Sequence, residues 1–104
     1  MQSTSSTKKT LSKDQVIEML ETVFDPELGL DIWTMGLVYA IDIKSDTVID
    51  ILLTYTTPLC PSGEQIKEDI ETSLSMLGFK QVHITVTFDP PWKPSDELRV
   101  ALGV

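Results

Sequence analysis

Residues 37–55 read LVYAIDIKSDTVIDILLTY, and this stretch decides the fold. Large apolar side chains occupy every second position of its first half, which is the period typical of a half-buried strand. These residues are Leu37, Tyr39, Ile41 and Ile43. A second run of β-forming residues covers 48–55, and Ser45 with Asp46 supplies a turn between the two runs. Because the connection is short, the stretch predicts an antiparallel hairpin.

A helix is expected on the N-terminal side of this hairpin. Ser12, with Gln15 three residues later, forms a capping-box signature. Apolar residues then follow at helical spacing, namely Val16, Met19, Leu20 and Val23. The helix should end near Asp25, because a proline such as Pro26 disfavours helical backbone in the residue before it. Residues 25–36 are expected to form a loop with an exposed Trp33.

A second helix and a third strand are expected on the C-terminal side. Residues 56–63 contain two prolines and predict a loop. The helix after it has an inner apolar stripe, made of Ile66, Ile70, Leu74 and Leu77. Gly78 should end this helix, and residues 82–88 alternate as a strand.

The expected order of the elements is therefore α-β-β-α-β. A strand, a crossover helix and another strand normally form a right-handed unit with parallel strands. The third strand should thus join the hairpin in one small mixed three-stranded sheet, with both helices over one face. The sequence predicts an α+β fold in two layers.

The two ends of the chain complete this description. Residues 1–10 predict a flexible N-terminal tail, and residues 11–104 predict a single domain, since roughly 100 to 200 residues usually form one core. The proline-rich run 89–94 fits neither helix nor strand. Ser95 would cap a short terminal helix with Leu98 and Leu102 inside.

The composition excludes several classes of ligand. The formal net charge is −8, from 16 acidic and 8 basic side chains, and such a surface repels phosphate backbones and anionic membranes. No apolar run approaches the roughly 20 residues that span a bilayer, and no secretory signal is visible. No glycine-rich phosphate loop is present. We expect a soluble cytoplasmic protein that binds no nucleic acid, membrane or nucleotide.

Cys60 is the candidate chemical centre. It is the only cysteine, so one chain can form neither a disulfide nor a four-thiolate metal site. With Pro61 as the first helical residue, Cys60 would be the N-cap of the second helix, and the helix end would favour its thiolate. With Ser62 as the cap and Gln65 completing a box, Cys60 lies two residues further out. The alternative is that Cys60 is a small buried apolar filler.

Threonines and carboxylates are candidate supporting groups. Thr54, Thr56 and Thr57 lie at one strand end and could donate hydrogen bonds to a thiolate or a sulfide, although threonine is also an ordinary strand and turn residue. In the 25–36 loop, hard oxygen ligands that suit iron are Asp25, Glu27 and Asp31. An Asx turn or plain solvation is favoured for Asp25 and Asp31, whereas the two explanations are balanced for Glu27.

The remaining polar and aromatic candidates have weaker support. His83 is the only histidine, and strand alternation directs it away from the core. A nucleophile and base pair of Cys60 with His83 is therefore not favoured. Trp33 and Trp92 are interpreted as core or anchor residues.

Four motifs, in this order and spacing, resemble the SufT/PaaD-like metal-sulfur cluster biosynthetic family of iron-sulfur cluster assembly domains. They are Asp25-Pro26-Glu27, Asp31-Ile32 with Gly36-Leu37-Val38-Tyr39, residues 53–61 (LTYTTPLCP), and Asp89-Pro90-Pro91-Trp92. The resemblance covers nearly the whole folded part. The chain lacks the cysteine-rich C-terminal extension of the phenylacetate-pathway members, so a general maturation factor fits better. Leu59 stands where family members often carry glycine.

The resemblance implies an iron-sulfur cluster assembly domain fold, with a reactive cysteine at Cys60 that contacts metal or cluster. It also implies that Asp25, Glu27, Thr56 and Thr57 gather around Cys60, and Asp31 belongs to the same motifs. The expected function is non-catalytic delivery or insertion of a transient iron-sulfur cluster, or iron, into client proteins. One thiolate per chain requires further ligands, from a second copy in a homodimer, a client or a small thiol. The alternatives are a pure adaptor among assembly components and a thiol enzyme that uses Cys60.

Overall fold

The computed structural model describes residues 11–102, and the side chains of residues 11–100. The expected tail at residues 1–10 and the expected packing of Leu102 therefore lie outside the described part. Along the chain, the elements are α1 (Lys13–Leu20), β2 (Phe24–Asp25), β3 (Leu30–Asp31), β4 (Val38–Ile43), β5 (Val48–Leu53), α2 (Gly63–Leu77), β6 (Gln81–Val86) and α3 (Asp96–Leu102). The α+β class is confirmed, and the main elements follow the expected order.

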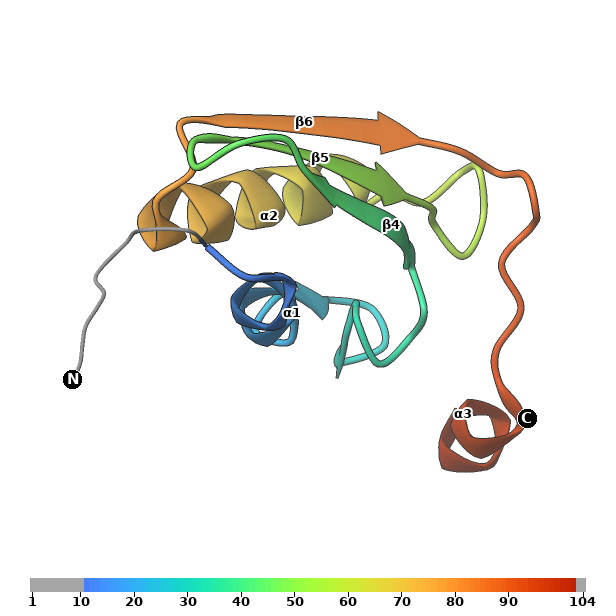
Figure 1. The fold of residues 1–104 in the computed structure, drawn as a ribbon. Helices are drawn as coiled ribbons and strands as arrows, with labels where there is room; N and C mark the ends of the chain where they lie inside the picture. The colour runs from blue at the N-terminus through green and yellow to red at the C-terminus, as the bar shows by residue number, and fades with distance from the viewer. Residues whose placement is uncertain (1–10, 103–104) are drawn as a thin grey trace, which may run out of the picture.

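The sheet has the predicted mixed topology. β5 is the central strand, between β4 and β6. β4 pairs with β5 antiparallel, and β6 pairs with β5 parallel. α2 crosses over between the two parallel strands, and Figure 1 shows α1 and α2 on the same side of the sheet. The chain leaves the end of β5 for α2 through residues 54–62, which we call the Cys60 loop.

The core lies between this covered face of the sheet and the helices. The apolar side chains with no more than 1% exposure come from α1 (Val16, Leu20), β5 (Ile49, Ile51, Leu53), α2 (Ile66, Ile70, Leu74) and the segment before β4 (Ile32, Leu37). The predicted stripe of α2 is therefore buried, with Leu77 half-buried at its end. Gly78 caps α2 at a φ of 135°, a conformation that favours glycine.

β4 departs from simple alternation at its start. Val38 lies opposite Leu53, whereas Ala40 lies opposite Leu52. Tyr39 is the extra residue of this β-bulge, and its hydroxyl donates to the carbonyl of Pro90 at 2.8 Å. The alternation predicted for 37–43 therefore holds only after the bulge.

α1 begins as predicted but ends earlier. Ser12 and Gln15 form the complete capping box. The prediction that the helix continues to near Asp25 is wrong, because it ends at Leu20. The hydroxyl of Thr22 donates to the carbonyl of Met19 at 2.6 Å, and this turn leads into β2, which pairs with β3. The loop expected at residues 25–36 thus includes part of a small two-stranded sheet.

The C-terminal segment returns along the molecule to the 25–36 loop. The indole nitrogen of Trp92 donates to the carbonyl of Met35 at 2.6 Å, so the expected role of Trp92 as an anchor is confirmed. Ser95 accepts the backbone N–H of Leu98 at 3.1 Å, and Leu98 is buried. No helix within residues 11–102 has the length and apolar character needed to cross a membrane.

Candidate functional site

Cys60 lies in a tightly folded part of the Cys60 loop. Its backbone N–H donates to the carbonyl of Thr57 at 3.1 Å, and its carbonyl accepts from Gly63 at 3.3 Å. The side chain is half-buried against the core, whereas the neighbouring Leu59 is 86% exposed. No hydrogen bond to the sulfur is found within the described residues. The thiol is therefore close to the surface and free of polar contacts from the described part.

Cys60 is not the N-cap of α2, which corrects the first of the two predicted registers. The cap is Ser62, and α2 begins at Gly63. The second register is only half right, because Ser62 makes no side-chain cap hydrogen bond. An N-cap residue normally has extended backbone, but Ser62 has a ψ of 8°. Gln65, which was expected to complete the box, donates instead to Asp69 at 2.9 Å.

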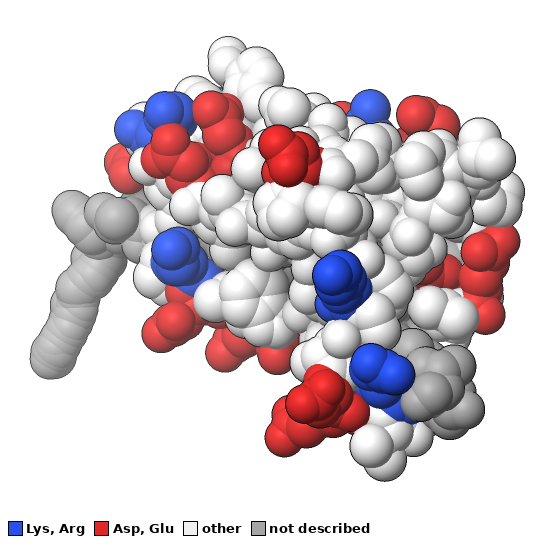
Figure 2. Space-filling model, turned by 90° about the vertical axis from the view of Figure 1, so that its right-hand side faces the viewer, with Lys and Arg blue, Asp and Glu red and all other residues white. Residues whose placement is uncertain are grey.

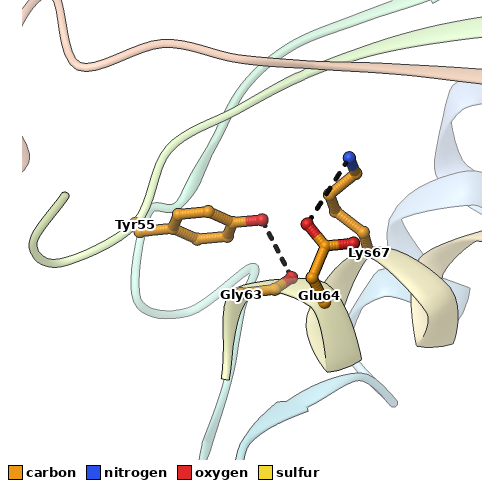
Figure 3. A network of polar contacts seen from close by, with 4 residues as sticks. All are labelled: Tyr55, Gly63, Glu64 and Lys67. Carbon is orange, nitrogen blue, oxygen red and sulfur yellow. Dashed lines mark hydrogen bonds and ion pairs between the residues drawn. The ribbon is translucent and has the colours of Figure 1, made fainter. Parts of the chain in front are cut away.

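Tyr55 is a residue of this site that the sequence analysis missed. It lies two residues beyond the end of β5 and is 9% exposed. Its hydroxyl donates to the carbonyl of Gly63 at 2.8 Å, which Figure 3 shows at the start of α2. Burial, followed by the charges of Glu64 and Cys60, raises the pKa of Tyr55 to about 12. The sequence held no local signal for this contact, because the contact depends on how closely the strand end approaches the helix.

The three threonines of this loop have separate roles. Thr54 is fully buried, and its hydroxyl donates to the carbonyl of Tyr55 at 3.4 Å. The hydroxyl of Thr57 accepts the backbone N–H of Leu59 at 3.2 Å. Thr56 is half-buried, and its hydroxyl makes no hydrogen bond within residues 11–102. Thr54 and Thr57 therefore hold the loop in shape.

We call residues 25–36 the carboxylate loop, and its backbone binds two of its own carboxylates. Asp25 is 2% exposed, and its carboxylate accepts the backbone N–H groups of Glu27 at 2.8 Å and of Leu28 at 3.3 Å. The carboxylate of Asp31 accepts the backbone N–H of Thr34 at 2.8 Å. This is the turn geometry favoured by the sequence analysis. Glu27 is exposed, and its carboxylate has no polar partner among the described residues.

The structure connects the motifs by backbone and aromatic contacts. The backbone N–H of Thr54 donates to the carbonyl of Leu37 at 2.8 Å. The ring of Phe88 lies 6.2 Å from the ring of Tyr55, with a tilt of 55°. Within residues 11–102, no three His, Cys, Asp or Glu side chains are grouped so that they could hold a metal ion. The described part therefore links the start of the Cys60 loop to the residue after the carboxylate loop, but it does not gather a set of His, Cys, Asp and Glu ligands around Cys60.

His83 lies on the exposed face of β6, as the alternation predicted. It is level with Asp50, near the middle of β5. The Cys60 loop begins beyond Leu53, at the far end of that strand. The arrangement does not bring an imidazole to the thiol. Trp33 is half-buried against the core, so the expectation of an exposed side chain was wrong and its interpretation as a core residue is confirmed.

Comparison with known proteins identifies the family. The chain is 34% identical to an Fe-S protein maturation auxiliary factor of Porphyromonas gingivalis, over 88% of this chain and 91% of the relative. It is 35% identical to the Fe-S protein maturation auxiliary factor SufT of Staphylococcus aureus, over 79% and 98% of the two chains.

A solved structure has the same fold. It is a conserved hypothetical protein of Thermotoga maritima, with 42% sequence identity and a TM-score of 0.81. The match covers 93% of this chain and 99% of the solved chain. The sequence profile described as "iron-sulfur cluster assembly protein" matches residues 13–86, which include the carboxylate loop and the Cys60 loop. The chain therefore belongs to the iron-sulfur cluster assembly protein family.

Proposed function

We propose that this protein is an iron-sulfur maturation factor that helps to deliver or insert clusters into client proteins and has no catalytic turnover of its own. The family match across residues 13–86 carries this proposal. Relatives over most of the chain are named Fe-S protein maturation auxiliary factors. The partners in this proposal are client proteins and other assembly components, and the compartment is the reducing cytoplasm, where a free thiol persists.

Cys60 is the proposed contact with the cargo, which is a transient iron-sulfur cluster or iron. Its sulfur lies in an exposed loop without a competing polar partner from the described residues. Glu27 and Thr56 are the proposed polar neighbours of the cargo, because their side-chain oxygens make no hydrogen bonds within residues 11–102. Asp25, Asp31 and Thr57 act indirectly by shaping the two loops.

One thiolate cannot complete the ligands of a cluster, which usually has four protein ligands. The other thiolates come from a second copy of this chain, from a client or from a small thiol. Loose holding of this kind suits a carrier that must release its cargo. Figure 2 shows the side of the molecule that lies at the right of Figure 1, where Lys, Arg, Asp and Glu side chains are scattered among a larger area of other residues. The exposed apolar side chains of the protein include Leu59 and Phe88.

Anaerobic reconstitution with ferrous iron and sulfide tests this function. Visible absorption and iron per chain would be measured for the native protein and for Cys60→Ser, followed by transfer to an apo iron-sulfur acceptor. We expect cluster absorption that Cys60→Ser abolishes. A matched control moves the thiol: the double variant Cys60→Ser, Ser75→Cys places it on an exposed position of α2. It should not restore binding if the loop matters.

Two results would count against the proposal. If the native protein takes up neither iron nor cluster, direct carriage is wrong and an adaptor function is favoured. If the relocated thiol restores full binding and transfer, any exposed cysteine suffices, and the Cys60 loop has no special part.

A further inference from the structure

One tyrosine, Tyr55, links the end of β5 to the start of α2. The hydroxyl of Tyr55 donates to the carbonyl of Gly63 at 2.8 Å. Figure 3 shows this bond beside the weak ion pair of Glu64 with Lys67, whose charged atoms are 4.0 Å apart. Tyr55 and Gly63 therefore fix the two ends of the segment that contains Cys60.

Close packing reinforces this bond. A Cβ atom on Gly63 would lie 2.8 Å from two ring carbons of Tyr55, which is closer than real contacts allow. Glycine is thus needed at this position for the ring to approach the helix. The ring is also supported by Phe88, with centroids 6.2 Å apart. The ring is therefore held between the first residue of α2 and the residue that follows β6 by two positions.

This contact reaches Cys60 through one backbone hydrogen bond. The N–H of Gly63 donates to the carbonyl of Cys60 at 3.3 Å, while the carbonyl of Gly63 accepts from Tyr55. A shift of Gly63 would displace the carbonyl of Cys60 and, with it, the half-buried thiol. Nothing comparable holds the side chain itself, because no hydrogen bond to its sulfur is found among the described residues.

We propose that Tyr55 is the positioning residue for Cys60, and that its hydroxyl bond to Gly63 holds the thiol in the orientation used for cluster transfer. This inference rests on the proposed function of Cys60. Tyr55 touches no cargo, and it acts only through Gly63 and the loop. Loss of its hydroxyl should let the loop open, so that the thiol becomes easier to reach but worse placed.

The hydroxyl of Tyr55 remains a donor at neutral and mildly alkaline pH. Burial, followed by the charges of Glu64 and Cys60, raises the pKa of Tyr55 to about 12. The bond to Gly63 therefore persists at neutral and mildly alkaline pH.

Tyr55→Phe and Tyr39→Phe form a matched pair for the test. Each removes one phenolic hydroxyl that donates to a backbone carbonyl at 2.8 Å, and only the bond of Tyr55 involves the Cys60 loop and the start of α2. The first measurement is the rate of Cys60 alkylation by iodoacetamide in the full chain. The second is transfer of a reconstituted cluster to an apo acceptor.

For Tyr55→Phe we expect alkylation to become faster by about two- to tenfold, the range that corresponds to one lost hydrogen bond. Cluster transfer should slow by a similar factor. Tyr39→Phe should leave both rates unchanged. If the two variants behave alike, or if Tyr55→Phe alters stability but neither rate, Tyr55 is only a core residue and the inference is wrong. Alkylation needs no cluster, so it tests Tyr55 even if the native protein fails to bind one.

Discussion

In the carboxylate loop, Asp25 and Asp31 are bound by backbone N–H groups of the same loop. In the Cys60 loop, the polar bond comes from Tyr55 to Gly63, and the thiol itself is left without such a partner among the described residues. Both loops carry residues that can bind metal. The difference teaches that the first loop uses two of its carboxylates to fold, whereas the second leaves its thiol without a hydrogen-bonding role among the described residues. Substitutions should therefore separate stability from chemistry.

The largest expected effect is at the end of the Cys60 loop. Gly63→Ala should destabilise the protein by about 1–3 kcal/mol, because the added methyl group overlaps the ring of Tyr55. Urea unfolding measures this free energy. In a Tyr55→Leu background the same substitution should cost less, since the overlapping ring is gone. Equal costs in both backgrounds would show that the overlap with Tyr55 is not the cause.

The next effect concerns the carboxylate loop. Asp25→Ala should lower the free energy of unfolding by about 2 kcal/mol, because two backbone N–H groups lose a buried acceptor. Asp25→Asn keeps an acceptor oxygen and should cost less. Both variants should still bind iron after reconstitution if the carboxylate serves folding. An Asp25→Asn protein that folds normally but takes up no iron would make Asp25 a ligand and reverse the comparison.

The two helix starts give a smaller difference. Ser12→Ala should cost about 1 kcal/mol, because it removes a capping box. Ser62→Ala should cost only about a few tenths of a kcal/mol. Ser62 occupies the same helix position as Ser12, but its side chain makes no cap hydrogen bond. Chemical denaturation of both variants checks this. Similar losses would show that Ser62 stabilises α2 in another way.

The smallest effect is a dependence on pH. The pKa of Tyr55 is raised from 10.0 to about 12 in the folded state, so the stability that it contributes is fully present below pH 10 and is lost as the pH rises toward 12. The advantage of the native protein over Tyr55→Phe should therefore be constant from neutral pH to about pH 9 and shrink above pH 10. Urea midpoints across this range measure it. A constant difference up to pH 11 would contradict the raised pKa.

Much of the fold could be predicted, because the deciding signals are local. Four signals each depend on neighbours within a few residues: the alternation of 37–43, the β-forming run of 48–55, the apolar stripe of α2 and the capping box of Ser12. The parallel pairing of β6 followed from the crossover rule. The early end of α1 was missed because Val23 has helical spacing, yet its burial comes from the turn into β2.

The candidate site was predicted in part. Cys60 stood out because it lies between two prolines at a strand and helix junction, and the Asx turn at Asp25 has a local signature. The contact of Tyr55 with Gly63 was missed because it depends on how closely the strand end approaches the helix, which no local pattern encodes. Ser62 is the N-cap as predicted, but the capping box expected there does not form, because the ψ of Ser62 is set by the folded loop.

The position of β5 between β4 and β6 has a consequence for synthesis. A ribosome completes Cys60 before it makes β6, Thr87 and Phe88. The backbone N–H of Thr87 donates to Leu53 at 2.8 Å, and Phe88 packs on Tyr55. At translation rates of about 5–20 residues per second, residues 61–88 take about one to six seconds. The Cys60 loop therefore reaches its final set of contacts only after residues well beyond it have been synthesised.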